Sequence, residues 1–295
     1  MNPREAGFLL LTGKLGNPDR RTLTPAQLRT LARRAGMMER PDTDRDLNTQ
    51  DLYTLGYGPE MAERILSLLE EEALLHHYLQ WGKQAGCRPI SRVSGEYPRV
   101  LKDRLGMDAP GCLWIKGDIT ILSSPMVSLV GSRDLDSVNR EFAREAGRQA
   151  ALQGYTLVSG NARGADQEAQ NACLRAGGRV ISIVADVLSN HAPHDRILYI
   201  SEDGFDEPFS AQRALSRNRC IHALGEKTFV AQCAYQTGGT WDGTVRNLRF
   251  GWSPVYVFAD GSAPADLLAQ MGANSVSLPE LADFSALESS QHSFL

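Results

Sequence analysis

The chain has 295 residues, of which 42% are hydrophobic and 22% are charged, and its formal net charge is −4. A chain of this length can bury a sizeable core and is typical of one large domain with a smaller companion. The slightly negative charge excludes a general attraction to polyanions, so any nucleic-acid site must be a local patch.

No segment of the sequence approaches the length of a membrane span, and the N-terminal apolar stretch is too short and too poorly flanked for a signal peptide. The sequence therefore predicts a cytoplasmic protein with no membrane partner. The cysteines are odd in number and form no C-x-x-C pair, which argues against a disulfide framework and a zinc site. We expect the cysteines to be buried and to pack like small apolar residues. They are Cys87, Cys112, Cys173, Cys220 and Cys233.

Residues 1–85 are predicted to form a small all-helical domain of a SAM-like or helix-hairpin-helix type. The stretch TPAQLRTLARRAG offers a threonine cap and a proline at the first turn of a helix. A longer helical pattern follows in PEMAERILSLLEEEALLHHYLQWG, where Met61, Ile65 and Leu68 recur at helical spacing. Residues 86–124 are rich in proline and glycine, so we expect an extended connection that packs on a sheet domain.

Residues 125–260 alternate short apolar runs with helical stretches. The predicted strands are MVSLV, YTLV, VISIVA, ILYIS, TFVAQ and VYVF, and the helices between them include residues 211–224 and 241–250. Apolar strands alternating with helices predict an α/β fold, a mostly parallel sheet with helices on both faces. Residues 261–295 are expected to form a short C-terminal tail whose last residues are disordered.

Three glycine-containing loops follow strands of this predicted sheet. They are GSR at 131–133, SGNARG at 159–164 and QTGGT at 236–240, and two of them carry an arginine. In parallel sheets, ligands bind where strands end and helices begin, and loop amides and arginines both pair with phosphate oxygens. Each loop alone could be an ordinary tight turn, but the three together predict an anionic ligand that spans several strand ends. None has the G-x-G-x-x-G or Walker A pattern.

The order of the motifs resembles the DNA-processing protein A family, also called DprA or Smf. The resemblance is carried over roughly residues 97–258 by YPRVL, APGCLWIKGD, VSLVGSR, YTLVSGNARGADQEAQ, GGRVISIV, SRNRCIHALGEKTFVAQ and TGGTWDGTVRNL. It implies that residues 125–260 form an extended Rossmann-like DprA domain. It also implies a cytoplasmic bacterial protein of DNA processing and recombination that binds and protects single-stranded DNA, as in natural transformation. Such proteins help to load a RecA-type recombinase and often form a homodimer.

The resemblance and the three loops together give the residues expected to contact DNA phosphates. They are Gly131, Ser132, Arg133, Ser159, Gly160, Asn161, Arg163, Gly164, Arg217, Asn218, Arg219, Gly238, Gly239 and Thr240. Arginines and loop amides neutralise phosphates without reading bases, which suits the binding of any sequence. Arg217 and Arg219 could instead belong to a solvated helix face, and Asp166 is expected to be a helix-end charge rather than a catalyst.

Several positions depart from the family pattern. Asn161 and Ala165 stand where larger apolar residues are usual, Gln170 stands where histidine is common, and the segment between VISIVADVL and ISEDG is shorter. The residues after Phe258 are too few for the winged-helix domain that many members carry. These differences leave open a relative that works in phage defence, plasmid maintenance or a toxin–antitoxin pair.

The stretch LGYGPEMAERIL fits a helix-hairpin-helix pattern, in which the turn exposes backbone amides to a DNA phosphate. Gly56 and Gly58 are therefore candidates for a secondary DNA contact. Tyr57 and Glu60 flank the turn, where a lysine or arginine would favour DNA. A turn in a protein-binding helical hairpin is an equal alternative.

An enzyme of the same superfamily is the alternative to a DNA-binding protein. Nucleotide phosphoribohydrolases of the LOG type carry P-G-G-x-G-T-x-x-E, and their glutamate does acid–base chemistry. TGGTWDGTVRN lacks this glutamate, and we expect Asp242 to satisfy turn amides. His191 and His194 have a metal-like spacing but no third ligand nearby. We therefore predict a protein that is not an enzyme and has no cofactor or metal, with a nucleotide-sensing or nucleotide-cleaving relative as the alternative.

Overall fold

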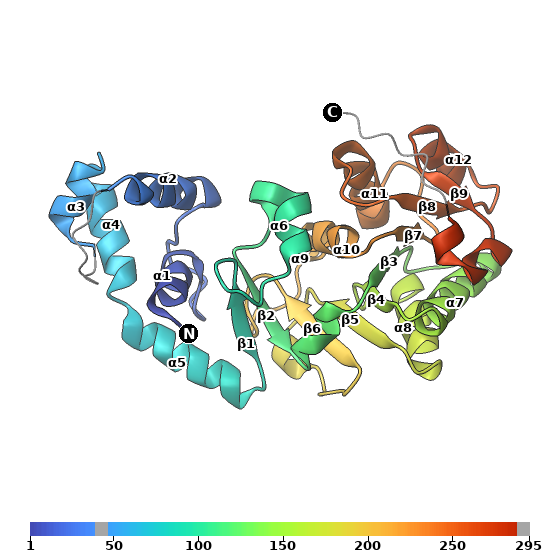
Figure 1. The fold of residues 1–295 in the computed structure, drawn as a ribbon, viewed down its shortest axis with the longest axis horizontal. Coiled ribbons are helices and arrows are strands. Elements are labelled where there is room, and N and C mark those ends of the chain that lie inside the picture. Colours follow the sequence, from blue (N-terminus) through green and yellow to red (C-terminus); the bar gives the residue numbers. More distant parts are fainter. Residues whose placement is uncertain (39–46, 288–295) are drawn as a thin grey trace. The chain divides into compact units, whose positions relative to one another are not determined.

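The computed structural model describes residues 1–38 and 47–287 (Figure 1). The chain divides into two compact units. Unit 1 comprises Met1–Tyr97, Pro110–Trp114 and Glu202–Asp206, and unit 2 comprises the remainder. Within the described chain, no helix combines the length and the apolar character that a membrane crossing requires.

Unit 1 is built mainly from helices, namely α1 (Pro3–Thr12), α2 (Pro25–Gly36), α3 (Thr49–Thr54), α4 (Pro59–Leu69) and α5 (Glu72–Gln84). Its core gathers the apolar faces of α1 to α4, including Leu31, Leu52 and Ile65. The pattern predicted one long helix where the structure has α4 and α5. Arg20 stabilises the break between them, because its guanidinium lies 2.6 Å from Glu71 and donates to the carbonyl of Leu68.

Residues 86–124 hold more regular structure than the predicted extended connection. They contain β1 (Arg88–Ser91), α6 (Arg99–Leu105), β2 (Cys112–Lys116) and two short 3-10 turns, η1 (Gly106–Asp108) and η2 (Ile119–Ser123). Proline and glycine here mark the ends of elements rather than a lack of them, since Pro98 caps α6 and Gly106 follows its last residue. Apolar residues between them are buried, among them Ile90 and Leu101.

The sheet of unit 2 is parallel, as the alternation of strands and helices predicted. Its strands run in the order β6-β5-β4-β3-β7-β8-β9, and these neighbours pair in parallel. The bounds are β3 (Met126–Val130), β4 (Thr156–Ser159), β5 (Arg179–Ile183), β6 (Ile197–Ser201), β7 (Thr228–Val230), β8 (Val255–Phe258) and β9 (Asn274–Val276). All carboxyl ends of these strands therefore lie at one edge of the sheet.

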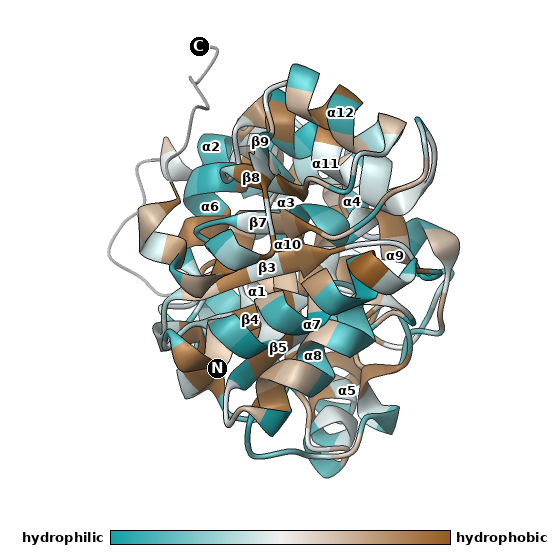
Figure 2. Ribbon diagram, turned by 90° about the vertical axis from the view of Figure 1, so that its right-hand side faces the viewer, coloured by the Kyte–Doolittle hydropathy of each residue, from teal (hydrophilic) through white to brown (hydrophobic). Residues whose placement is uncertain are grey.

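Helices cover both faces of this sheet, which confirms the predicted fold class. On one face, α7 (Ser137–Leu152) and α8 (Ala165–Arg175) bury Phe142 and Ala169 with Val127. On the other face lies α10 (Asn218–Leu224), where the carbonyl of Ile221 accepts a hydrogen bond from Ser128. Figure 2 shows the contrast between brown, apolar strands and the teal residues on the outer side of α7. The remaining helical elements are α9 (Ala211–Ser216), α11 (Gly238–Phe250), α12 (Ala263–Gln270) and η3 (Leu188–Asn190).

The predicted C-terminal tail is regular and packed as far as residue 287. It contains α12, β9, η4 (Pro279–Ala282) and η5 (Phe284–Ala286), and Leu281 and Phe284 join the core of the sheet. Gln153, the residue after α7, holds this segment by donating to the carbonyl of Leu281 and accepting from the amide of Phe284. The last residues of the tail, which were predicted to be disordered, lie outside the described part, which ends at residue 287.

The five cysteines form no disulfide. Cys87, Cys173, Cys220 and Cys233 are buried and Cys112 is half-buried, in agreement with their predicted role as small apolar residues.

Candidate functional site

A groove of about 380 Å³ opens in unit 2 beyond the carboxyl ends of β3, β4 and β5. Ligands of open parallel sheets bind at this edge, because loops and helix N-termini converge there. Its wall includes three arginines, one carboxylate and one phenyl ring. The lining residues are Arg133, Gly160, Asn161, Ala162, Arg163, Ala185, Asp186, Phe209, Ala214 and Arg217.

The carboxylate of Asp166 fixes the backbone of the loop after β4. One carboxylate oxygen of Asp166 accepts from the amides of Gly160 (3.0 Å) and Ala162 (3.2 Å). Burial raises the pKa of the Asp166 carboxyl, while Arg217 and the two amides act in the opposite direction. Asp166 is thus a buried anchor of the loop, a role that its predicted place at the end of a helix did not show.

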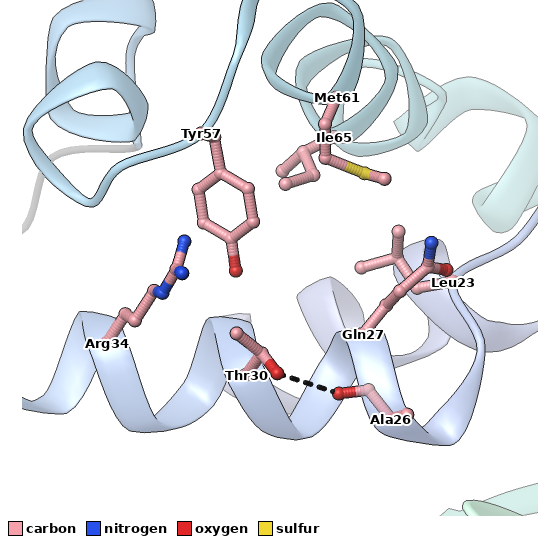
Figure 3. Close-up of a pocket in the computed structure, with 8 residues that line it drawn as sticks. All are labelled: Leu23, Ala26, Gln27, Thr30, Arg34, Tyr57, Met61 and Ile65. Atoms are coloured by element: carbon pink, nitrogen blue, oxygen red, sulfur yellow. Dashed lines mark hydrogen bonds between the residues drawn. The ribbon is translucent and has the colours of Figure 1, made fainter.

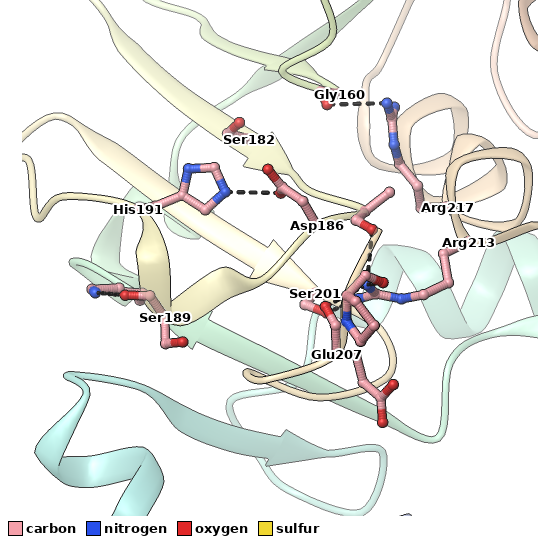
Figure 4. Close-up of polar contacts among 12 residues, drawn as sticks. Gly160, Ser182, Asp186, Ser189, His191, Ser201, Glu207, Arg213 and Arg217 are labelled. Atoms are coloured by element: carbon pink, nitrogen blue, oxygen red, sulfur yellow. Dashed lines mark hydrogen bonds and ion pairs between the residues drawn. The ribbon is translucent and has the colours of Figure 1, made fainter. Parts of the chain in front are cut away.

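Arg217 also fixes this loop, through its guanidinium group. Its side chain is buried, and its Nη2 donates to the carbonyl of Gly160 (3.0 Å) (Figure 4). The same nitrogen lies 4.0 Å from the Asp166 carboxylate. A solvated helix face, the alternative considered for Arg217, does not fit this burial. The carboxylate of Asp166, a residue of α8, and the guanidinium of Arg217 together fix the loop.

Two glycines are required where these loops meet. A Cβ atom on Gly160 would lie 1.7 Å from Nη1 of Arg217. Gly164 has a φ of +85°, and a Cβ atom there would lie 2.4 Å from the carbonyl oxygens of Ser132 and Arg133. Glycine at both positions therefore lets Arg217 and the GSR loop approach the backbone of the SGNARG loop.

Arg133 and Arg163 present the exposed positive charge of the groove. Arg163 lies 3.0 Å from Asp134, but the two side chains are 73% and 90% exposed. An ion pair so exposed contributes little free energy, so a phosphate can replace the carboxylate at low cost. The loop amides contribute less than the sequence suggested, because Asp166 engages two of them and the carbonyl of Ser132 accepts from Ala165.

Sequence reasoning missed Arg213, Asp186 and Phe209. Arg213 Nη1 donates to the carbonyls of Ala185 (2.8 Å) and Pro208 (2.7 Å), and its Nη2 donates to Ser201 (2.9 Å). Phe209, which follows Pro208, is 55% exposed and lines the groove. The sequence signal for these residues was weak, since only an aromatic residue shortly before the SRNR segment stands out.

Other predicted residues support the groove from outside its wall. Gly131 packs against Ala165 and Ala231, and the amide of Ser132 donates to Gln232. Ser159 is buried and accepts from Gln170 (2.7 Å). These contacts join the two loops to α8 and to the segment that follows β7.

The third predicted loop and the end of the SRNR segment also lie outside the groove wall. Gly238, Gly239 and Thr240 begin α11, and Asn218 donates to the carbonyl of Gly239 (2.9 Å). Arg219 donates to the carbonyls of Asp108 (2.9 Å) and Ser216 (2.7 Å). The structure thus brings together five of the predicted residues in one wall, namely Arg133, Gly160, Asn161, Arg163 and Arg217.

In unit 1, Gly56 and Gly58 form the turn between α3 and α4, beside a pocket of about 250 Å³ (Figure 3). Arg34 of α2 donates to the carbonyl of Gly56 (3.2 Å), and its guanidinium lies 4.8 Å from the ring centre of Tyr57. The fold therefore supplies the cation that the sequence beside the turn lacks.

Residues 1–38 and 47–287 contain no group of three or more side chains that could hold a metal ion. His191 and His194, which have a metal-like spacing, each pair with an aspartate instead. Nε2 of His191 lies 2.9 Å from Asp186, and Nδ1 of His194 lies 3.2 Å from Asp195.

Residues 88–276 match the family model of DNA recombination-mediator protein A. The chain belongs to this family. Protein Smf of Escherichia coli is 29% identical over 63% of this chain and 52% of its own length. DNA processing protein DprA of Bacillus subtilis is 26% identical over 53% of this chain and 56% of its own length. The chain thus spans about half the length of these curated relatives, and the resemblance seen in its motifs is confirmed.

Solved structures of the family share the fold. DprA of Streptococcus pneumoniae aligns with a TM-score of 0.67 and 23% identity, covering 90% of this chain and 99% of its own. DprA of Helicobacter pylori, whose structure concerns a single-stranded DNA binding mode, aligns with a TM-score of 0.54 and 21% identity, covering 66% and 94%.

Proposed function

We propose that the groove of unit 2 binds the phosphate backbone of single-stranded DNA. The observation that carries this proposal is the exposure of Arg133 and Arg163 on adjacent loops, with the buried Arg217 behind them. Guanidinium groups form charge-assisted hydrogen bonds with phosphate oxygens. The loops that carry the arginines are already fixed, so their backbone loses little conformational entropy when DNA binds.

Binding of this kind is independent of sequence to first order. Phosphate contacts position a strand without reading its bases, and each neutralised phosphate releases a condensed counterion. Phe209 adds an exposed ring on which one base stacks, a contact that single-stranded DNA allows and duplex DNA does not. The groove therefore prefers single strands to duplexes.

The cellular role that we propose is DNA processing and recombination, the role named in the relatives. The protein would act in the cytoplasm, as a homodimer, to protect single strands and to help load a RecA-type recombinase, in natural transformation or a related pathway. Gly56 and Gly58, with Arg34 beside them, would give a secondary DNA contact.

We further propose that the protein acts by binding rather than by catalysis. Asp242, the carboxylate closest in sequence to the position of the missing glutamate, is exposed on α11 and does not line the groove. The groove carries cations that hold phosphate, but its one carboxylate, Asp186, is paired with His191.

Binding of a labelled oligothymidylate, followed by fluorescence anisotropy, tests the proposal. Arg133→Ala combined with Arg163→Ala should weaken binding by at least tenfold, since each lost charge-assisted contact contributes on the order of 1.5 kcal/mol. Arg99→Ala is the matched control, because Arg99 is 90% exposed and lies outside the groove wall. Unchanged oligonucleotide affinity in the double variant would refute the proposal. If the double variant instead lost binding of a mononucleotide alone, the groove would be a small-molecule site.

A further inference from the structure

One end of the groove is acidic, and phosphate binding does not explain it. Asp186 lines the groove with a side chain that is 53% exposed, yet a carboxylate repels phosphate. Asp186 follows β5, whereas Arg163 follows β4 and Arg133 follows β3. Neighbouring strands lie about 4.8 Å apart, so the ends of β5 and β3 are about 10 Å apart. The groove is therefore cationic over β3 and β4 and acidic over β5.

His191 fixes the position of the Asp186 carboxylate. Its Nε2 lies 2.9 Å from Oδ1 of Asp186 (Figure 4). Its ring stacks on Tyr199 with 4.6 Å between the ring centres. Within the described residues, the second oxygen of Asp186 has no hydrogen-bond partner. The carboxylate is thus held in place, and its second oxygen can accept a further hydrogen bond.

An aromatic ring belongs to the same end of the groove. Arg213 donates to the carbonyl of Ala185, which precedes Asp186, and to the carbonyl of Pro208, which precedes Phe209. A single guanidinium therefore ties together the two segments that carry the carboxylate and the exposed phenyl ring. A ring for stacking and an acceptor for hydrogen bonds are the two elements that recognise an unpaired base.

We propose that Asp186 reads the Watson–Crick edge of a guanine that stacks on Phe209, an inference that rests on the proposed binding of DNA phosphates at Arg133 and Arg163. Guanine presents two adjacent donors on this edge, N1–H and the N2 amino group, which match the acceptor lone pairs of a carboxylate. Adenine and cytosine present one amino group beside a ring-nitrogen acceptor. Thymine presents one N–H between two carbonyl oxygens that a carboxylate repels. The groove thus adds a preference for guanine to its sequence-independent affinity.

Competition between matched oligonucleotides tests this preference. The probes are an oligothymidylate and the same oligomer with spaced guanines or spaced inosines, because inosine keeps N1–H and lacks the N2 amino group. The wild-type protein should bind the guanine oligomer about fivefold more tightly than the oligothymidylate, with inosine close to thymine. Asp186→Asn should remove the preference, measured as the ratio of its affinities for the guanine oligomer and the oligothymidylate. Asp195→Asn, whose carboxylate is 85% exposed and outside the groove wall, should keep it.

Equal affinities of the wild-type protein for the three oligomers would overturn the proposal, as would a guanine preference that survives Asp186→Asn. Both results leave the binding of single-stranded DNA intact. Failure of the oligothymidylate itself to bind would instead refute the proposed function, and the guanine proposal with it. Asp186 is half exposed, so its replacement should not unfold the protein, and a thermal melt of the variant checks this.

Discussion

His222 on α10 is a buried histidine whose protonation opposes folding. Its side chain is fully buried, its Nδ1 accepts from Asn247, and its Nε2 has no partner in the described chain. Burial lowers the pKa of His222 from 6.5 to about 3. Below pH 6.5, His222 of the unfolded chain therefore binds a proton that His222 of the folded chain does not bind. The free energy of unfolding falls as the pH drops towards 3.

Replacing His222 should remove this pH dependence. The unfolding free energy of the wild-type protein should fall between about pH 7 and about pH 5 by roughly 2 kcal/mol more than that of His222→Leu. Urea denaturation at the two pH values measures the difference. His77→Gln, at an exposed position of unit 1, is the control and should keep the wild-type difference. The same drop in His222→Leu and in the wild-type protein would show that His222 is not the group responsible.

The space at Gly160 is filled by the guanidinium group of Arg217. A methyl group there would overlap the Arg217 guanidinium, so Gly160→Ala should cost about 2 kcal/mol of stability and displace Arg217 from the loop. Chemical denaturation and oligothymidylate affinity should both report the change. Gly95→Ala is the matched control, since no atom lies within 4 Å of the position of its added Cβ, and its stability should stay within about 0.5 kcal/mol of wild type. Wild-type stability in Gly160→Ala would contradict this packing of Arg217.

At the scale of elements, the segment after α12 is part of the core. Phe284 is fully buried and packs 4.8 Å, between ring centres, from Phe229 of β7. Phe284→Ala should therefore destabilise the protein by about 3 to 5 kcal/mol, as measured by urea denaturation. Phe250→Ala removes the same ring where it is 56% exposed, and should cost much less. Equal costs for the two variants would mean that the C-terminal segment does not contribute to the core.

Local pattern predicted the central elements well and the peripheral ones poorly. The runs MVSLV, ILYIS and VYVF coincide with β3, β6 and β8, because each is a short, mostly apolar stretch. β9 escaped prediction because its three residues form a strand only by pairing with β8, a contact that no local pattern encodes. The division of the chain into a helical domain up to residue 85 and a sheet domain from residue 125 stays a prediction.

At the scale of the whole molecule, the sequence predicted the cationic half of the groove and not the acidic half. Arg133 and Arg163 could be found because their loops follow strands of a parallel sheet, and such loops meet at one edge. Asp186 also follows a predicted strand, but an acidic residue did not fit the phosphate-binding pattern that singled out the other loops. Phe209 could not be found, because the fold brings it to the groove, where Arg213 donates to the carbonyls of Ala185 and Pro208. Likewise, only the folded chain shows that Arg219 faces Asp108 rather than the groove.

The net charge of −4 means that attraction to DNA must come from local cationic patches, so the loss of one groove arginine should show in the salt dependence of binding. The slope of log affinity against log salt concentration counts the phosphates that the protein neutralises. Arg133→Ala should lower the magnitude of this slope for an oligothymidylate by about 0.7, the value for one phosphate of a single strand. Arg99→Ala should leave the slope at its wild-type value. A slope that is unchanged in Arg133→Ala, with the protein folded, would contradict the binding of DNA phosphates in this groove.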